Sequence, residues 1–396
     1  MNAVPLPTLP SEWISIRLKW LLDSLESGRR EVSESDSFEG GALSIGGEHI
    51  GWHGEWLLEN PRYISREFFT AMSNGQIREN DILLVKDGAT IGKVAIATKL
   101  PADESAVNEH VFLLRMQSEN VPKYYFYFVQ SSLAQEQIQL EIRGSAQPGL
   151  NSEFRNALVA PKPPRHLQQA IADYLDRETA RIDALIETKE QVLALLAEKR
   201  RVLITRAITR GLDPHVPLRD SGIPWLGKIP AHWEVNRARW LFRERDVRSE
   251  TGEEELLSVS HLTGVTPRSE KEVNMFEAQT NEGYKTCIPG NLVINTLWAW
   301  MGAMGIARVK GIVSPAYNVY QLEDKLEPSY IDALVRLPVF AQEVTRYSKG
   351  VWSSRLRLYP EGFFEVFLPL PALDEQRVIV GHIARETAKL DKIGSA

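Results

Sequence analysis

The sequence lacks the features that mark secreted, membrane-spanning or strongly basic proteins. Its 396 residues include one cysteine, Cys287, so no disulfide can form within the chain, which fits a reducing cytoplasm. Proline, glycine or a charge interrupts every apolar run before 18 residues, so we expect no membrane span. Residues 1–10 contain no apolar signal core. These absences predict a cytoplasmic protein.

The chain also lacks an excess of positive charge. Lys and Arg number 46 against 52 Asp and Glu, which leaves a net charge of −6. The chain therefore lacks the bulk positive charge that is typical of nucleic-acid binders. Any DNA-binding surface must be a local patch.

Catalytic and metal-binding motifs are missing as well. The run GATIGK, residues 88–93, has three residues between its glycines and Val94 after its lysine, whereas a phosphate-binding loop needs four residues and then Ser or Thr. We find no G-x-S-x-G elbow and no Asn-Pro-Pro or Asp-Pro-Pro followed by an aromatic residue. His49 and His53 have no acidic or cysteine ligands arranged around them. The sequence predicts a protein that is not itself an enzyme and holds no metal.

The chain does contain a long internal repeat. Three pairs of segments align in the same order, at offsets of 220, 210 and 208: residues 9–22 with 229–242, 81–97 with 291–307, and 161–183 with 369–391. In the first pair the identical positions are Pro10/Pro230, Trp13/Trp233, Arg17/Arg237, Trp20/Trp240 and Leu21/Leu241. A period of this length indicates tandem duplication of a domain-sized unit, not a solenoid.

Each copy begins with a pattern that predicts a globular α+β domain. Trp13, Ile16, Trp20 and Leu21 recur at helical spacing, so we expect a short helix whose tryptophans anchor the core. Short apolar runs bounded by turn residues predict strands, at 42–45, 82–85 and 111–114 and, in the second copy, at 256–259, 292–294 and 318–322. The aromatic stretch 124–129 predicts a helix that runs to about Ile142.

A second kind of segment follows the first domain. Residues 165–210 contain neither Gly nor Pro, Pro163-Pro164 precede them and Gly211 follows, which predicts one helix of 46 residues. The apolar residues at heptad spacing predict a seam that needs a partner helix: Ile171, Leu175, Ile182, Leu185, Val192, Leu196 and Leu203. Residues 199–210 include five basic side chains and no acidic one. They either complement the helix dipole and face solvent, or contact a partner or the DNA backbone.

The order of these motifs is typical of one protein family. The tryptophan segment, DGATIGKVA (87–95), GSAQPGLN (144–151), QQAIADYLDRETARIDALI (168–186) and the connector DSGIPWLGKIPAHW (220–233) occur together. In this order the chain closely resembles the specificity subunit of type I restriction–modification enzymes. The resemblance extends over essentially the whole chain.

The resemblance implies a fold and a function. It implies two tandem-duplicated α+β target recognition domains with long coiled-coil spacer helices, each domain reading one half of a bipartite double-stranded DNA target. The implied limits are a first recognition domain at 1–164, a spacer helix at 165–211, a connector at 212–228, a second recognition domain at 229–371 and a shortened spacer helix at 372–396. The helices would dock adenine-N6 methyltransferase subunits, and restriction subunits would join the complex. S-adenosylmethionine, ATP and Mg would be used by those partners, and no cofactor by this chain.

Loop residues able to reach bases or phosphates are the candidate DNA contacts. Lys86, beside a predicted turn, is a candidate for a phosphate. The other candidates lie in two corresponding stretches, 143–151 and 349–357: Arg143, Ser145, Gln147, Asn151, Lys349, Ser353, Ser354, Arg355 and Arg357. An ordinary surface loop is the alternative for all of them. Trp298 and Trp300 could pack on sugars or bases, but we expect them to be buried.

The second copy runs only a few residues past Asp391, whereas the first continues to Gly211. The uncovered stripe on the long helix is then expected to drive self-association. A coiled-coil scaffold without DNA readout is the alternative function. An enzyme in its own right is disfavoured by the missing catalytic motifs.

Overall fold

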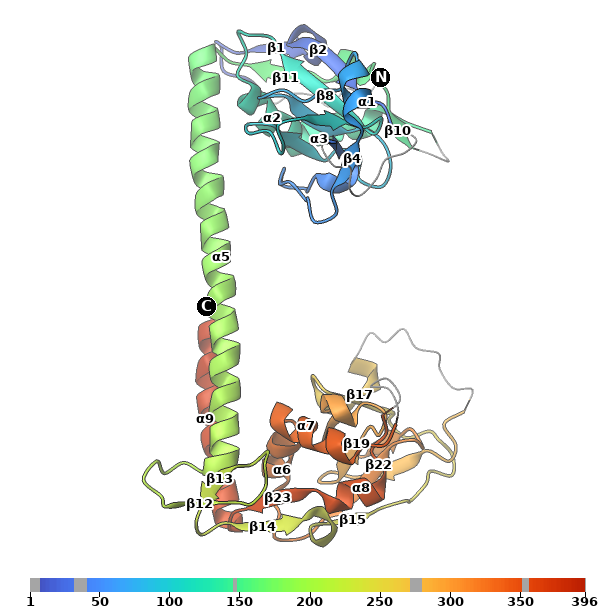
Figure 1. Cartoon of the computed structure of the whole chain (residues 1–396), viewed down its shortest axis with the longest axis vertical. Helices are drawn as coiled ribbons and strands as arrows, with labels where there is room; N and C mark the ends of the chain where they lie inside the picture. The colour runs from blue at the N-terminus through green and yellow to red at the C-terminus, as the bar shows by residue number, and fades with distance from the viewer. Residues whose placement is uncertain (1–7, 32–40, 145–147, 271–279, 351–355, 396) are drawn as a thin grey trace. The chain divides into compact units, whose positions relative to one another are not determined.

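The computed structural model describes residues 8–31, 41–144, 148–270, 280–350 and 356–395. The chain divides into two compact units, Met1–Ile186 and Glu187–Ala396, with the division inside one long helix, α5 (Arg165–Arg210). Figure 1 displays the elements of both units. The predicted domain limits, which give this helix a region of its own, stay predictions.

Unit 1 is built around an antiparallel sheet in the order β2-β8-β5-β6. A smaller sheet, β4-β3-β7, packs beside it, and short strand pairs join β1 to β11 and β9 to β10. Its strands are β1 (Ile14–Arg17), β2 (Leu22–Ser27), β3 (Ala42–Ile45), β4 (Arg62–Ile64), β5 (Ile82–Val85), β6 (Val94–Ile96), β7 (Ser105–Val107), β8 (Val111–Met116), β9 (Ile142–Arg143), β10 (Gly149–Leu150) and β11 (Val159–Lys162). Its helices before α5 are α1 (Arg66–Ala71), α2 (Pro122–Gln130), α3 (Ser132–Glu141) and α4 (Phe154–Ala157), with 3-10 turns η1 (Leu18–Trp20) and η2 (Gly47–His49).

The central strand β5 is apolar at every position because the sheet is covered on both faces. Ile82 and Leu84 face one core, which includes the aromatic residues of α2. Leu83 and Val85 face a second core, formed with β3. A strand buried on both faces reads as a continuous apolar run, not as an alternating one. The predicted strands at 42–45, 82–85 and 111–114 are confirmed.

The helix predicted from the aromatic stretch is broken in the middle. Ser131 has extended backbone angles, and its side chain accepts a hydrogen bond from Ala134 N at 3.4 Å, so it ends α2 and caps α3. Serine favours such caps because its hydroxyl replaces a missing backbone acceptor. The sequence therefore predicted the helical content here but not the break.

Unit 2 repeats the central topology in the order β15-β22-β19-β20. Its strands are β12 (Leu218–Asp220), β13 (Lys228–Pro230), β14 (Glu234–Arg237), β15 (Phe242–Glu244), β16 (Leu257–Ser260), β17 (Gly264–Pro267), β18 (Lys285–Cys287), β19 (Leu292–Ile294), β20 (Met304–Ile306), β21 (Gly311–Val313), β22 (Asn318–Leu322) and β23 (Phe367–Leu370). Its helices after α5 are α6 (Pro328–Val335), α7 (Pro338–Tyr347), α8 (Pro360–Glu365) and α9 (Leu373–Gly394), with 3-10 turns η3 (Ala238–Trp240), η4 (Arg268–Glu270) and η5 (Ala299–Met301). The predicted strands at 292–294 and 318–322 are confirmed, and the one at 256–259 is displaced by one residue.

The short helix predicted at the start of each copy is wrong. Residues 14–17 form β1, which pairs antiparallel with β11, and residues 234–237 form β14, which pairs with β23 in the same way. Only the turns η1 and η3 are helical. A partner strand far along the chain decides the conformation here, so local spacing could not reveal it. Of the two tryptophans expected to anchor the first core, Trp13 is half-buried and Trp20 is exposed. In the second copy Trp233 is buried, but Trp240 is exposed.

The long helix is confirmed with the predicted limits. Gly211, just past its end, has φ +71° and its N–H donates to Ala207 O at 3.1 Å, a left-handed ending that suits glycine. Within unit 2, α9 runs beside the last part of α5 (Figure 1). Arg200 of α5 forms an ion pair with Asp391 and donates to Thr387 O at 3.4 Å. Within the described residues, no helix is long and apolar enough to cross a membrane.

A buried glutamine joins each spacer helix to its globular domain. Gln168 accepts a hydrogen bond from Val121 N at 2.9 Å and donates to Pro163 O at 2.9 Å. At the equivalent position Gln376 accepts from Glu327 N at 2.8 Å and donates to Lys325 O and Pro371 O. Both side chains are almost completely buried. In each unit the buried amide therefore ties the first turn of the spacer helix to the residue just before α2 (unit 1) or α6 (unit 2).

Gln168→Leu should destabilise unit 1 by about 2 kcal/mol, because Val121 N and Pro163 O would be left without their buried partner. Denaturant unfolding measures the loss of stability. Gln169→Leu is the matched control, since Gln169 is exposed and bonds only the side chain of Asp173. Equal stability of the two variants would contradict the role of the buried amide.

Candidate nucleic-acid interface

In unit 1 the fold brings Lys86 and the 143–151 stretch onto one surface. Leu150 N donates to Lys86 O at 2.6 Å, and Asp87 forms an isolated antiparallel bridge with Gly149. The turn after β5 and the β9–β10 hairpin are therefore neighbours, although about sixty residues separate them in the sequence. We call this the unit 1 hairpin surface. Ser145 and Gln147 lie outside the described residues.

The three described candidates differ in how freely they present polar atoms. The side chain of Arg143 is 70% exposed and lies 3.9 Å from a carboxylate oxygen of Glu141. Asn151 is exposed, but its Oδ1 accepts from Glu153 N at 2.9 Å and so shapes the turn into α4. The ammonium of Lys86 lies 5.0 Å from the centre of the Phe112 ring, and the residue is half-buried. Arg143 is the best placed of the three to reach a ligand.

His110 is a part of this surface that sequence reasoning missed. Its Nδ1 lies 2.6 Å from Asp87 Oδ1, its Nε2 lies 3.3 Å from Glu109 Oε1, and its carbonyl accepts from Lys86 N at 3.0 Å. The imidazole thus ties the Asp87 turn to the start of β8. No local motif marks this pairing, because Asp87 and His110 meet only through the β5–β8 register.

Unit 2 contains the same arrangement with different side chains. Lys349 and Arg357 exchange two backbone hydrogen bonds of 2.9 Å, and Leu358 N donates to Thr296 O at 3.0 Å, as Leu150 N does to Lys86 O. Lys349 and Arg357 are both exposed. This is the unit 2 hairpin surface. Ser353, Ser354 and Arg355 lie outside the described residues.

Trp298 is exposed, contrary to the expectation that it is buried. The 3-10 turn η5 directs Ala299 into the core, and Trp298, immediately before it, is 51% exposed. Trp300 is half-buried, and its Nε1 donates to Leu297 O at 3.1 Å. Gly302, with φ +89°, closes the turn. Ala299 is the buried residue of this turn, and Trp300 and Met301 are half-buried.

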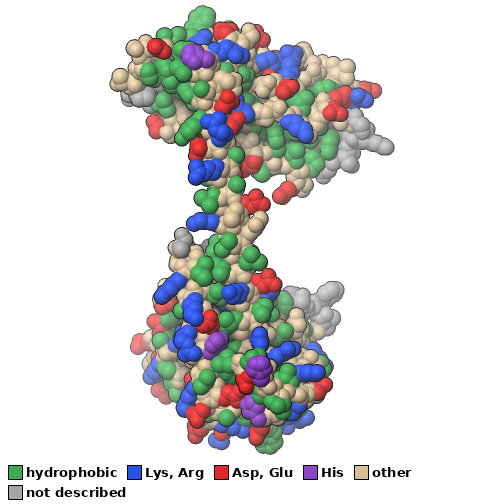
Figure 2. All heavy atoms as spheres, turned by 90° about the vertical axis from the view of Figure 1, so that its left-hand side faces the viewer, with side chains coloured by type: hydrophobic (Ala, Val, Ile, Leu, Met, Phe, Trp, Pro, Cys, Tyr) green, Lys and Arg blue, Asp and Glu red, His purple; other side chains and the backbone are tan. Residues whose placement is uncertain are grey.

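The predicted seam of α5 is covered at its ends and bare in its middle. Ile171 and Leu175 are half-buried in unit 1, and Leu196 and Leu203 are half-buried in unit 2. Ile182, Leu185 and Val192 are exposed at 54%, 57% and 42%. Figure 2 shows hydrophobic side chains on this bare part of the helix.

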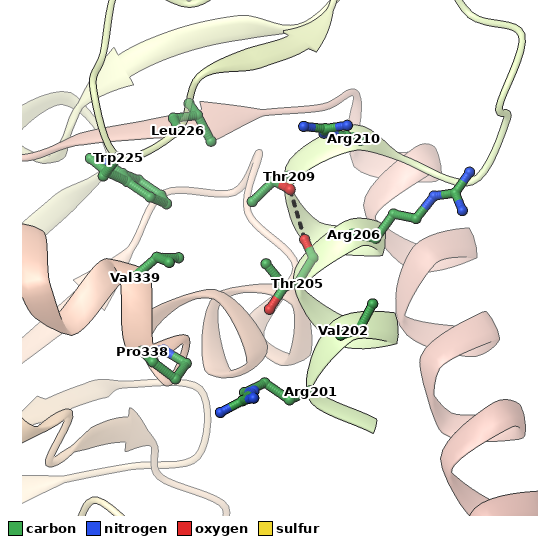
Figure 3. Close-up of a pocket in the computed structure, with 10 residues that line it drawn as sticks. All are labelled: Arg201, Val202, Thr205, Arg206, Thr209, Arg210, Trp225, Leu226, Pro338 and Val339. Carbon is green, nitrogen blue, oxygen red and sulfur yellow. Dashed lines mark hydrogen bonds between the residues drawn. The ribbon is translucent and has the colours of Figure 1, made fainter. Parts of the chain in front are cut away.

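The basic end of α5 lines a cavity within unit 2. The cavity measures about 610 Å³, and Trp225, Leu226, Pro338 and Val339 form its apolar wall. Figure 3 shows Arg201 and Arg210 at opposite ends of it, while the Arg206 side chain points away from Trp225. Arg200, by contrast, is used within the chain, in the ion pair with Asp391. Four of the five basic residues thus divide between helix pairing, which uses Arg200, and the cavity lining, which includes Arg201, Arg206 and Arg210.

The sequence of the chain is similar to that of known DNA specificity proteins. Residues 10–195 match the model of the type I restriction modification DNA specificity domain. The MjaVIII specificity subunit of a type I restriction enzyme from Methanocaldococcus jannaschii is 21% identical over 229 residues, which cover 57% of this chain and 48% of that protein. The chain therefore spans about half the length of this relative.

Two solved structures share the fold at 17% sequence identity. One is a chain from a study of complex assembly and conformational transition in the type I R-M system, with a TM-score of 0.63 over 98% of this chain and 94% of the other. The second is the HsdS subunit from Thermoanaerobacter tengcongensis, with a TM-score of 0.59 over 98% and 93%. The α+β expectation, with duplicated units and a long helix, is confirmed. Residues 10–195 of the chain therefore match the type I restriction modification DNA specificity domain, and over almost its whole length the chain shares the fold of these two solved structures.

Proposed function

We propose that this chain is a non-catalytic DNA-recognition subunit that reads a bipartite, gapped target, one half with each unit. The observation that carries the proposal is the repeated hairpin surface. The backbone arrangement is the same in both units, but the exposed side chains differ, with Arg143 in one and Lys349 and Arg357 in the other. The same backbone arrangement with different exposed side chains is what we expect of two domains that recognise different half-sites.

The acidic composition is compatible with this role, because a few local contacts suffice. Phosphate contacts position a protein on the duplex, and a small number of base contacts specify the sequence. Methyltransferase subunits would dock on the spacer helices, and restriction subunits would join through the complex. This chain would bind no cofactor, whereas its partners would use S-adenosylmethionine, ATP and Mg.

Mapping N6-methyladenine in host DNA, with and without the gene for this chain and always with its methyltransferase subunit, tests the proposal. A gapped two-part motif that depends on the gene is the expected result. If no motif depends on the gene although the chain is folded and binds the methyltransferase subunit, the chain is a scaffold without readout.

The bare stripe on α5 supports the prediction of self-association. The side chains of Ile182 and Leu185 are more than half exposed to solvent. Burying this apolar surface against a second copy of the chain would be favourable. Sedimentation velocity over a wide concentration range should detect dimers, and the double variant Ile182→Glu/Leu185→Glu should shift the equilibrium toward monomer by at least about tenfold. A protein that stays monomeric at all concentrations contradicts the prediction. Val378→Glu, at an exposed position on α9, is the control.

A further inference from the structure

Two tryptophans are identical in both copies although neither packs in a core. Trp20 and Trp240 occupy the same place in the repeat and are 61% and 66% exposed. Leu21 and Leu241, which follow them, are also identical, but both are completely buried. Packing within the chain explains why the leucines are the same in both copies. It does not explain the tryptophans, since an exposed indole contributes little to folding.

Both tryptophans are held on the same rigid platform. Each is the last residue of a 3-10 turn that follows a strand paired to the segment before the spacer helix. The turns are fixed by equivalent hydrogen bonds of 2.8 Å, from Leu18 N to Leu158 O and from Ala238 N to Val366 O. The same surface is therefore built twice on one chain.

These surfaces lie at the end of each central sheet opposite the hairpin surface. In unit 1, Leu22, two residues after Trp20, pairs with Met116, whereas Val85, next to Lys86, pairs with Val111. The length of β8 separates the two ends, about 17 Å at roughly 3.4 Å per residue. In unit 2, Phe242 pairs with Leu322, while Ile294 pairs with Asn318. The tryptophans therefore do not belong to the candidate DNA contacts.

Basic side chains beside the two tryptophans indicate what kind of surface a partner would need. A basic residue stands one and three positions before each tryptophan, as Lys19 and Arg17 in unit 1 and as Arg239 and Arg237 in unit 2. The ammonium of Lys19 lies 4.9 Å from the centre of the Trp20 ring. In unit 2, both arginines form ion pairs with Glu365, and each arginine side chain remains 42% exposed. A complementary surface would offer an apolar pocket with an acidic rim.

We propose that, in addition to the spacer helices, Trp20 and Trp240 anchor two equivalent docking surfaces, each for one copy of the same protein partner, and that this partner is the methyltransferase subunit. The proposal rests on the proposed function, which supplies the partner. A large aromatic residue beside basic side chains is the typical anchor of a protein interface. Two copies of one surface on one chain fit two copies of one partner.

The test measures how many methyltransferase subunits bind the full-length chain, by native mass spectrometry and by titration calorimetry. Trp20→Ala and Trp240→Ala should each weaken one of two binding events by about 30-fold, and the double variant should weaken both. Trp20→Phe should restore most of the binding at its site. Trp52→Ala is the matched control, because Trp52 is 59% exposed in unit 1 but lies outside the repeated segments.

The outcomes separate the inference from the proposed function. Melting temperatures within about 2 °C of the wild type would establish that the variants are folded, as expected for exposed positions. If the double variant binds two subunits as tightly as the wild type, or has impaired DNA binding instead, the docking surfaces are wrong while the recognition role stands. If the wild-type chain binds no methyltransferase subunit, the proposed function fails and the inference fails with it.

Discussion

Arg143→Glu should alter the reading of one half-site and leave the other unchanged. On the unit 1 hairpin surface, the Arg143 side chain is 70% exposed. A reversed charge there would remove a bond to base or phosphate and add repulsion, so that DNA affinity should fall by about 30-fold. Arg357→Glu should have the same effect on the other half-site, because the unit 2 hairpin surface is the equivalent reader. Competition binding with targets altered in one half at a time measures both effects.

The salt dependence of binding distinguishes the kind of bond that Arg143 makes to DNA. If Arg143 binds a phosphate, its removal lowers the slope of log affinity against log salt by about one, equally for all sequences. If it binds a base, its removal relaxes discrimination at one position of one half-site. Arg66→Glu is the control, since Arg66 lies on α1, is not one of the residues that form the hairpin surface, and is 69% exposed. If Arg143→Glu and Arg66→Glu bind alike, the hairpin is an ordinary surface loop.

Arg115→Met should destabilise unit 1 by about 3 to 5 kcal/mol, the largest stability effect we expect in the chain. Arg115 Nε and Nη2 donate to the two carboxylate oxygens of Asp81 at 2.8 Å each, and Nη1 contacts Glu26. The Asp81 side chain is 1% exposed, and that of Arg115 is 14% exposed. Removal of the guanidinium would leave two carboxylates without their cation beside the β2–β8–β5 sheet. Denaturant unfolding at about pH 7 measures the loss of stability.

The same cluster predicts a pH dependence. Burial alone would raise the pKa of Glu26, but the Gly75 N–H and the Arg115 charge outweigh it and hold that pKa below its ordinary value of 4.5. A pKa that is lower in the folded chain adds stability above about pH 4.5, and this stability is lost as the pH falls through the folded value. The deficit of Arg115→Met should therefore shrink at about pH 3.

An exposed ion pair provides the comparison for Arg115. Arg66 Nη2 lies 2.7 Å from Glu104 Oε1, but the arginine side chain is 69% exposed. Solvent screens such pairs, so Arg66→Met should cost less than about 1 kcal/mol. Equal destabilisation in the two methionine variants would mean that the buried cluster has no special role.

The sequence by itself determined the features that depend on neighbouring residues or on the repeat. The limits of α5 follow from good helix formers between Pro163-Pro164 and Gly211, so local propensity was sufficient to predict them. Strand β5 was recognisable because four apolar residues in a row suit a strand buried on both faces. The duplication predicted that both units share one topology, since aligned segments in the same order encode the same elements.

Only the tertiary structure decided what depends on pairing across long distances. Strand β1 exists because β11 lies beside it, and that pairing leaves Trp20 on the surface although its spacing resembled a helix core. Lys86, His110 and the β9–β10 hairpin meet through the β5–β8 register, which no local pattern encodes. Arg115 finds Asp81 and Glu26 for the same reason. Residue types suggested which side chains could contact DNA, but strand pairing decided which of them lie together. Packing and backbone hydrogen bonding override the local conformational preference of each segment.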